Sequence, residues 1–389
     1  MKEILTLNPI SDRIYDHLSK EEYSVSAQAK EPEGILVRSA DMHEFSLPKS
    51  VMAVARAGAG TNNIPCAEYA LKGVTVFNTP GANANGVAEL VLGAMLLSSR
   101  NLSQASAWVD TLNGMGSEVP KLVEKGKKAF VGHEIRGKKL GVIGLGAIGG
   151  LVANDAYNLG MEVLGFDTHL SVDAAWRLSR KIQKAACREQ IFAECDVITL
   201  HVPLLDETRG IINKDSIALM KDGVMILNFA RGELVNTADV IAALESGKIS
   251  RYVTDFPCQE LIGVRNAVLI PHLGASTPES EENCASMGAE ELIDFLEHGN
   301  IQNSVNLPTV HMGPNGAARM TVVHKNQPNM IATITDTISK DGMNIAAFTD
   351  KNRGEIAYSI IDTDTAYSAS VVADIEKIDG VIRVRVIQD

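Results

Sequence analysis

The stretch Leu140-Gly-Val-Ile-Gly144-Leu-Gly146-Ala-Ile-Gly149 decides the fold of the central part of this chain. The apolar residues 140–143 predict a buried strand, and three glycines with the spacing GxGxxG follow it directly. Gly144 permits a tight turn, Gly146 lets a pyrophosphate approach the backbone, and Gly149 lets the following helix pack closely on the strand. The start of that helix offers free N–H groups to an anion. The stretch therefore predicts a dinucleotide-binding βαβ unit.

An acidic residue stands at the place where such a unit contacts a ribose. The next predicted strand, residues 161–166, ends just before Asp167. A carboxylate there can bond the ribose 2′-OH and would repel a 2′-phosphate, so the pattern favours NAD over NADP. Glycine-rich turns also occur for structural reasons, and Asp167 could be an ordinary turn residue. The joint occurrence of strand, glycines, helix, second strand and acidic residue favours the dinucleotide.

Apolar runs alternate with helical patterns on both sides of this unit, which predicts parallel sheets with right-handed crossovers. Long helices are expected over residues 87–109 and 280–298, and a glycine-containing loop is expected before the basic run at residues 125–128. We expect the strands of the first series at residues 4–7, 34–37, 51–54 and 74–77, and the later strands of the second at residues 196–200, 223–227, 251–254 and 267–270.

The last seventy residues have a different pattern. Residues 306–316 are rich in Pro, Gly and Asn, which is typical of a linker. Beyond them the order is β-α-β-β-α-β, a ferredoxin-like arrangement, with Asn329 in the turn before the first helix. Asparagine tolerates the left-handed conformation better than most residues. Strands are expected near residues 319–324, 344–349, 355–361 and 381–386, and helices near residues 330–340 and 367–378.

Composition limits the partners. The 389 residues include 36 Lys and Arg against 48 Asp and Glu, a net charge of −12, which disfavours nucleic acid. The five cysteines form no metal-ligand spacing, and we expect reduced thiols, with a reactive Cys258 as the alternative. The longest apolar stretch is too short to cross a membrane. The N-terminus has no signal-peptide pattern, so we expect a cytoplasmic protein that uses no metal and does not bind membranes.

Three polar side chains are predicted to lie just beyond strand ends in the second series: Arg231, Glu260 and His272. Ligands bind beyond the carboxyl ends of strands in such sheets. A histidine suits proton transfer from a hydroxyl near neutral pH, a carboxylate beside it would orient the ring, and an arginine can hold a substrate carboxylate. Taken singly, a core histidine, a surface arginine and a solvated glutamate are the simpler interpretations. Their common position beside a dinucleotide fold favours catalysis of hydride transfer.

The chain resembles the D-isomer-specific 2-hydroxyacid dehydrogenase family over about residues 1–308. The resemblance implies Arg231, Glu260 and His272 as the catalytic residues, and Asp255 near the nicotinamide carboxamide. The matching strings are Arg56-Ala-Gly-Ala-Gly60, Asn78-Thr-Pro80, Val87-Ala-Glu-Leu90, residues 141–149, His201-Val-Pro203, Asn228-Phe-Ala-Arg-Gly232, residues 255–260 and Pro271-His-Leu-Gly-Ala-Ser-Thr277. The cofactor residues that it implies are Gly144, Gly146, Ala147, Ile148, Gly149, Asp167, His201, Val202, Pro203, Ala230, Asp255, His272 and Gly274.

The resemblance also implies the domain organisation. Residues 1–98 and 282–308 would form a flavodoxin-like substrate domain, and residues 99–281 a Rossmann domain for NAD. Residues 317–389 resemble an ACT domain, a small regulatory module. Family members with an ACT domain act on D-3-phosphoglycerate, so the expected reaction is its NAD-dependent oxidation to 3-phosphohydroxypyruvate in serine synthesis. The alternatives are a hydroxypyruvate or glyoxylate reductase, and an NAD-sensing interaction protein.

The same resemblance assigns residues to the substrate and to an effector. Arg38, Arg56 and Lys127 would bind the phosphate, although a solvated loop explains Lys127 nearly as well. Backbone N–H groups around Ala59 and Gly60 would bind the carboxylate. His324, Asn326 and Asn344 would contact an effector serine, with a strand-end histidine and a turn asparagine as the simpler readings. A homodimer or homotetramer is expected.

Overall fold

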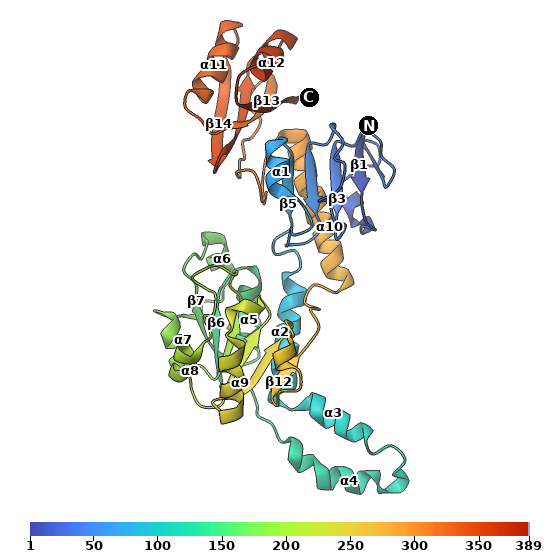
Figure 1. Cartoon of the computed structure of the whole chain (residues 1–389), viewed down its shortest axis with the longest axis vertical. Coiled ribbons are helices and arrows are strands. Elements are labelled where there is room, and N and C mark those ends of the chain that lie inside the picture. Colours follow the sequence, from blue (N-terminus) through green and yellow to red (C-terminus); the bar gives the residue numbers. More distant parts are fainter. Residues whose placement is uncertain (388–389) are drawn as a thin grey trace. The chain divides into compact units, whose positions relative to one another are not determined.

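The computed structural model describes residues 1–387 and divides into two compact units (Figure 1). The central unit comprises Asn83–Ser280. The discontinuous unit comprises Met1–Ala82 and Glu281–Asp389, so it includes the C-terminal module. Within the described residues, no helix has both the length and the apolar composition needed to cross a membrane.

The central unit contains a seven-stranded parallel sheet in the order β12-β11-β10-β9-β6-β7-β8. Its inner strands are buried apolar runs, as expected for a parallel sheet covered on both faces. The doubly wound fold expected from the glycine stretch is confirmed. The strands are β6 Lys139–Ile143, β7 Glu162–Phe166, β8 Gln183–Lys184, β9 Val197–Leu200, β10 Val224–Asn228, β11 Ile249–Thr254 and β12 Ala267–Leu269.

Helices flank this sheet, and their ends follow ordinary capping rules. Asn236 caps α9 (Thr237–Ser246) by accepting from the Asp239 N–H, and Gly247 ends it in the left-handed conformation. The others are α2 Ala84–Ser99, α3 Leu102–Asp110, α4 Val119–Gly126, α5 Ala147–Asn158, α6 Val172–Arg177, α7 Arg188–Glu194 and α8 Lys214–Leu219, with 3₁₀ turns at Gly116–Glu118, Lys127–Phe130, Gly232–Leu234 and Gln259–Leu261.

The prediction of a single helix over residues 87–109 is wrong. It is interrupted at Asn101, whose φ of 52° is left-handed, so α2 and α3 are separate helices. The Asn101 side chain donates to the Val131 carbonyl at 3.2 Å, and Arg251 donates to its Oδ1. These contacts come from segments distant in sequence. The loop expected before residues 125–128 instead contains α4, with a proline in its first turn. Together α3 and α4 project as an arm from the sheet of this unit (Figure 1).

The first part of the discontinuous unit is a five-stranded parallel sheet in the order β2-β1-β3-β4-β5, which confirms the flavodoxin-like prediction. Helix α10 packs on it through Ala285, Ala289 and Leu292 and continues into a π-helical turn, Asp294–His298. The elements are β1 Lys2–Thr6, β2 Tyr23–Ser26, β3 Gly34–Val37, β4 Ala53–Arg56, β5 Thr75–Asn78, α1 Cys66–Leu71, α10 Pro278–Ile293 and a 3₁₀ turn at Asp12–Asp16. The short strands β2 and β8 were not predicted.

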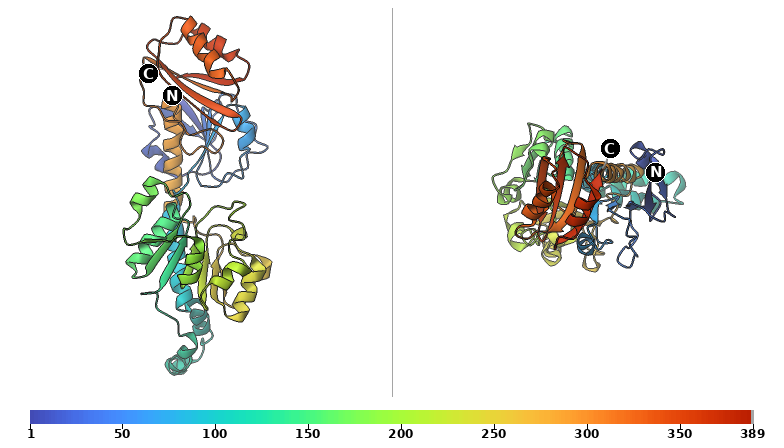
Figure 2. Two further views of the ribbon diagram at one scale, coloured as in Figure 1. Left: turned by 90° about the vertical axis from the view of Figure 1, so that its left-hand side faces the viewer. Right: turned by 90° about the horizontal axis from the view of Figure 1, so that it is seen from above.

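The C-terminal module is an antiparallel sheet in the order β14-β15-β13-β16 with two helices, as the β-α-β-β-α-β pattern predicted. Asn329 is left-handed, with a φ of 66°, as its place in the turn suggested. The two helices cover one face of the sheet (Figure 2). The elements are β13 Ala318–Lys325, α11 Met330–Lys340, β14 Ile345–Arg353, β15 Ile356–Thr363, α12 Ala369–Glu376 and β16 Val381–Ile387.

The other face of this sheet packs on the first part of the same unit. Val323, Tyr358 and Ile360 share a hydrophobic cluster with Phe77 and Phe295. Arginines of the C-terminal module also donate hydrogen bonds to backbone carbonyls in the first part of this unit. Arg385, for example, donates to the Phe295 carbonyl.

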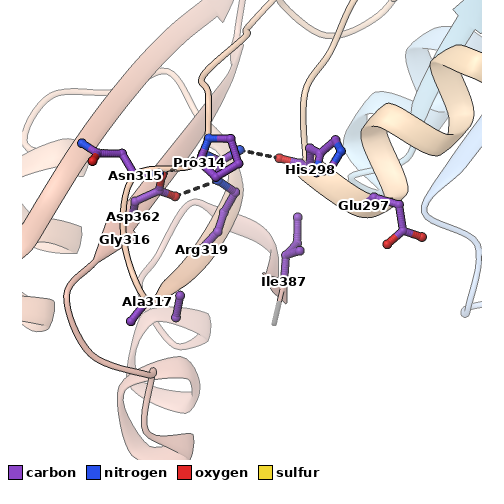
Figure 3. Close-up of a pocket in the computed structure, with 10 residues that line it drawn as sticks. Glu297, His298, Pro314, Asn315, Gly316, Ala317, Arg319, Asp362 and Ile387 are labelled. Carbon is purple, nitrogen blue, oxygen red and sulfur yellow. Dashed lines mark hydrogen bonds and ion pairs between the residues drawn. The ribbon is translucent and has the colours of Figure 1, made fainter. Parts of the chain in front are cut away.

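Arg319 is the most heavily bonded of these arginines. Its guanidinium forms a buried, bidentate pair with Asp362 at 2.7 Å and donates to the His298 carbonyl at 2.8 Å (Figure 3). It also donates to the carbonyls of Met312 and Gly313 in the linker. The module is therefore held to the end of the α10 helix by both apolar and charged contacts.

Candidate active site

The glycine turn has the geometry that its sequence predicts. Gly144 has a φ of 93°, and a Cβ there would lie 2.4 Å from the His201 carbonyl oxygen. A Cβ on Gly149 would lie 1.9 Å from the Gly144 carbonyl oxygen, so helix α5 packs closely on the turn. A Cβ on Gly146 would meet no atom within 4 Å. The backbone at Gly146, just before the helix start at Ala147 and Ile148, is thus open to a ligand.

Asp167 follows β7 and lies against this turn. Its Oδ2 accepts from the Leu145 N–H and its Oδ1 from the His169 N–H, each at 2.7 Å. A pocket of about 600 Å³ lies beside it. The residues that line the pocket include Gly144, Gly146, Asp167, Thr168, His169, Arg188, His201, Val202, Pro203 and Thr208. An acidic side chain, an open glycine backbone and a helix start around one pocket fit the adenosine and pyrophosphate parts of NAD.

His201 follows β9, lies against the glycine turn and also lines this pocket. Burial lowers the pKa of His201 to about 4, so the ring is neutral at physiological pH. Its Nε2 lies 2.9 Å from the Thr199 hydroxyl, while Nδ1 is buried and bonded to no group within residues 1–387. His201 therefore presents a neutral polar atom to the pocket rather than a charge.

Arg231 follows β10, and a buried asparagine shapes its loop. Asn228 donates from Nδ2 to the Arg231 carbonyl at 2.9 Å and accepts from the Ala230 N–H at 3.3 Å. The Tyr252 hydroxyl lies 3.3 Å from the same Nδ2. The Arg231 side chain is exposed, and within residues 1–387 its Nη1 donates only to the neighbouring Ala230 carbonyl, at 2.6 Å. The guanidinium is thus free to bind an anion.

Asp255 and His272 follow the two neighbouring strands. Asp255 is 2% exposed, and its Oδ1 has no hydrogen-bond partner within residues 1–387. Burial raises the pKa of Asp255, and the nearby charges of His272 and Arg231 act against the shift. The exposed His272 ring lies 4.9 Å, between centroids, from the Phe256 ring. The structure therefore brings Arg231, Asp255 and His272 together at the carboxyl ends of β10, β11 and β12.

Glu260 is exposed on the 3₁₀ turn after Asp255. Hydrogen bonds from the backbone and from the Cys258 thiol lower the pKa of Glu260, so the carboxylate is ionised at neutral pH. Within the described residues it forms no hydrogen bond with His272. The charge of His272 acts instead on the pKa of Asp255, where it opposes the rise caused by burial. Gly274, two residues beyond His272, packs against Val87, where a Cβ would lie 3.0 Å from its Cγ2.

In the discontinuous unit, Arg38 and Arg56 lie at the ends of the adjacent strands β3 and β4. Arg38 pairs with Glu281, while the buried Nε of Arg56 has no partner within residues 1–387. Burial lowers the pKa of Arg56; the nearby Cys284 opposes this shift and Arg38 adds to it. The two arginines thus lie at neighbouring strand ends, with the Arg38 charge paired to Glu281 and the Arg56 Nε unpartnered within the described residues.

The backbone after Arg56 is also open. A Cβ on Gly58 would lie 2.2 Å from Arg56 Nη1, so only glycine leaves room for this guanidinium. Ala59 and Gly60 are exposed, and a Cβ on Gly60 would meet nothing within 4 Å. Asn78 steadies the loop by donating to the Ala59 carbonyl at 2.5 Å. The N–H groups at positions 59 and 60 are available to a carboxylate.

Lys127 is exposed in the central unit's arm and pairs with Glu124 one turn earlier on the chain. Nothing else in that unit contacts its ammonium group within the described residues. The expected contact between Lys127 and the substrate phosphate therefore stays a prediction.

The three expected effector residues differ in exposure. His324 is 2% exposed, with Nδ1 2.9 Å from the Lys325 carbonyl and Nε2 2.9 Å from Asp350 Oδ1. Both ring nitrogens are therefore used inside the module. Asn326 and Asn344 are exposed, and Asn326 Nδ2 donates to the Gly354 carbonyl at 3.1 Å. Their contact with serine stays a prediction.

Several site residues were not predicted from the sequence. Thr168 and His169 follow Asp167 directly, so the end of the strand could have indicated them. Arg188 and Thr208 line the pocket from separate segments and carry no local motif. Tyr252 lies inside a strand, where an aromatic residue is ordinary core material.

Comparisons with known proteins agree with this geometry. The family model for the NAD-binding domain of D-isomer-specific 2-hydroxyacid dehydrogenases matches residues 92–274. A D-3-phosphoglycerate dehydrogenase from Haemophilus influenzae is 33% identical over 340 residues, covering 84% of this chain and 79% of that protein. The human D-3-phosphoglycerate dehydrogenase is 33% identical over 299 residues, covering 75% of this chain and 53% of its own.

Solved structures show the same relationship. The NAD⁺-bound 3-phosphoglycerate dehydrogenase of Entamoeba histolytica matches with a TM-score of 0.60 and 27% identity. The match covers 78% of this chain and 98% of that one. The chain spans 79% of the Haemophilus relative, but only 49–60% of the length of several others. The extent of these matches and the glycine-turn geometry lead to one conclusion: the chain belongs to the D-isomer-specific 2-hydroxyacid dehydrogenase family and is an NAD-dependent dehydrogenase.

Proposed function

We propose that this chain oxidises D-3-phosphoglycerate to 3-phosphohydroxypyruvate with NAD, the first step of phosphorylated L-serine synthesis. The observation that carries the proposal is the likeness to the Haemophilus D-3-phosphoglycerate dehydrogenase over 84% of the chain. The grouping of Arg231, Asp255 and His272 at neighbouring strand ends supports the same chemistry. The same grouping would serve a family member that acts on an unphosphorylated hydroxy acid, so the choice of substrate rests on the likeness to the D-3-phosphoglycerate dehydrogenases.

Proton transfer is the part of the reaction that the chain's own residues perform. NAD, when bound, accepts the hydride that leaves C2 of the hydroxy acid. The hydroxyl proton passes to the His272 imidazole, and the electron pair of the O–H bond becomes the second bond of the new carbonyl. The exposed Arg231 guanidinium binds the substrate carboxylate and stabilises charge on the reacting oxygen. The reverse reaction returns the proton from the imidazolium.

Two carboxylates have separate roles in this proposal. Glu260, ionised at neutral pH, pairs with the imidazolium that forms on His272. The buried Asp255 would help to hold the nicotinamide carboxamide, since its Oδ1 atom has no protein partner within the described residues. This division gives each carboxylate one partner.

We assign further contacts with the substrate's anionic groups to the discontinuous unit. Arg38 and Arg56 bind the phosphate, and the N–H groups of Ala59 and Gly60 bind the carboxylate. The support is the Nε of Arg56, which has no partner in the described part of the chain, and the open backbone at Gly60. Lys127 is proposed as a further phosphate contact.

We also propose the organisation in which this activity operates. Residues 1–98 and 282–308 form the substrate domain, residues 99–281 the NAD domain, and residues 317–389 an ACT domain that binds L-serine through Asn326, Asn344 and His324. The protein is a homodimer or homotetramer in the cytoplasm. The five free cysteines are consistent with a reducing compartment.

The substitution Arg56→Gln tests the substrate assignment. A charge-assisted hydrogen bond is worth about 1.5–3 kcal/mol, so kcat/KM for D-3-phosphoglycerate should fall by about 10- to 150-fold. Activity with D-glycerate, which lacks the phosphate, should change little. The matched control is Arg13→Gln, which removes an exposed arginine of the same unit. An equal loss with both substrates would contradict phosphate binding by Arg56.

A further inference from the structure

A second pocket of the central unit lies at the edge of the sheet opposite the glycine turn. Its volume is about 500 Å³. Residues at the beginnings of β9, β10 and β11 line it, whereas the residues assigned to the cofactor follow the ends of the strands. The remaining walls are the end of α2 with Asn101 and the segment 131–135. The pocket is thus separate from every residue assigned above to NAD or to catalysis.

Arg251 is the central side chain of this pocket. The register between β10 and β11 shifts here: Val224 pairs with Ile249 and Met225 with Arg251, so Ser250 is skipped. Bulges of this kind re-aim side chains. Arg251 Nη2 donates to Asn101 Oδ1 at 2.5 Å and Nη1 to the Ser250 carbonyl at 2.7 Å. The irregular register therefore holds a guanidinium at the pocket wall.

This guanidinium has no counter-ion in the described part of the chain. No carboxylate within residues 1–387 forms a salt bridge with Arg251, and its buried Nε has no acceptor there. Burial and the neighbouring Arg265 both lower the pKa of Arg251, which shows that its charge is poorly compensated. Burying a charge without a partner is costly, so an anion at this place would be stabilised.

The other lining groups favour the same ligand. Ser98 is 4% exposed, and its hydroxyl has no partner within the described residues. Two of the three carboxylates that line the pocket are already neutralised, Asp196 by Lys221 at 3.0 Å and Asp222 by Lys248 at 2.8 Å. The third, Glu134, is exposed and has no salt bridge within the described residues, and the same holds for the lining Lys138. The partly buried groups without a counter-charge or partner are thus the Arg251 guanidinium and the Ser98 hydroxyl.

We propose that this pocket binds a small oxyanion, carried as a carboxylate or phosphate group by a metabolite. The Arg251 guanidinium and the Ser98 hydroxyl are its donors. Guanidinium groups suit both anions because their planar donors match pairs of oxygens. The site is independent of the proposed substrate, since it lies in the central unit and uses no residue of the catalytic group.

Calorimetric titration of the full chain with inorganic phosphate and with citrate tests the proposal. The titrations use an Arg56→Gln background with saturating NAD, which weakens the proposed phosphate contact and occupies the cofactor site. Binding at the remaining substrate contacts is distinguished because Arg251→Gln would not change it. At least one probe should bind. Arg251→Gln should weaken that binding by roughly tenfold or more, and Ser98→Ala by a smaller factor. Binding of citrate alone would identify a carboxylate ligand, and binding of phosphate alone a phosphate ligand.

The matched control is Arg265→Gln, which removes the same charge nearby without removing a lining residue. It should weaken binding by less than about threefold, because an exposed charge is screened. Should Arg251→Gln fail to fold, as judged by NAD binding, Arg251→Lys keeps the charge but loses Nε and should still weaken binding. The proposal fails if neither probe binds, if Arg251→Gln binds as tightly as its parent, or if Arg265→Gln loses as much.

Discussion

The substitutions Gly146→Ala and Gly149→Ala separate two functions of the turn between β6 and α5. At Gly149 the added Cβ would lie 1.9 Å from the Gly144 carbonyl oxygen, about 1.5 Å closer than an ordinary contact. The helix must then move away from the turn. Overpacking of this kind costs about 1–3 kcal/mol, or roughly 2–4 °C in Tm for each kcal/mol. Gly149→Ala should therefore destabilise the protein without any ligand.

At Gly146 the added Cβ meets no protein atom within 4 Å, so the free protein should unfold at the wild-type temperature. The methyl group would instead occupy the space into which we expect the pyrophosphate to fit. The overpacking cost of about 1–3 kcal/mol would then arise only when NAD binds. The affinity for NAD should therefore fall by about 5- to 150-fold.

Thermal unfolding of both variants with and without NAD, together with calorimetric titration of NAD, distinguishes these effects. We expect a lower Tm without NAD only for Gly149→Ala, and a wild-type Tm with weak NAD binding for Gly146→Ala. Wild-type NAD affinity in Gly146→Ala would refute our account of the glycine turn. A Gly149→Ala protein as stable as the wild type would show that the helix is not packed as described.

Three further predictions concern other parts of the molecule. His272→Ala should abolish turnover while NAD still binds in titrations; unchanged kcat would remove the catalytic assignment. Arg319→Ala should lower the free energy of unfolding by about 3–5 kcal/mol in urea, because it leaves a buried, unpaired Asp362; a double variant that also carries Asp362→Leu should lose less, and equal losses would argue against a coupled pair. Burial raises the pKa of Glu291 to about 8, above the ordinary value of 4.5, so the folded state favours the protonated form. The stability of the wild type relative to Glu291→Gln should therefore fall as the pH rises from about 4.5 and level off above about 8; a pH-independent difference in urea unfolding would contradict this.

Local patterns predicted most of the cofactor-binding fold. The glycine spacing, the strand before it and Asp167 are close in sequence, and their geometry follows from φ values and contacts within one βαβ unit. The parallel arrangement of both sheets follows from the alternation of strands and helices. The regular β-α-β-β-α-β pattern likewise predicted the C-terminal module.

Features set by distant contacts were not predicted. Asn101 interrupts a continuous helical pattern because it contacts Arg251 and Val131, which are separated from it by 150 and 30 residues. Glu260 forms no hydrogen bond with His272 within the described residues, and this depends on how the short turn after β11 places the exposed Glu260 side chain. The packing of the C-terminal sheet on the α10 end rests on arginines whose acceptors are backbone carbonyls, which have no signature in the sequence.

Steady-state formation of NADH by the purified chain, with D-3-phosphoglycerate compared against D-glycerate, tests the proposed function most directly. We predict NAD-dependent turnover with a kcat/KM that is higher for the phosphorylated acid, because Arg38 and Arg56 bind its phosphate. Equal or greater activity with D-glycerate, or no NADH from D-3-phosphoglycerate, would contradict the proposal.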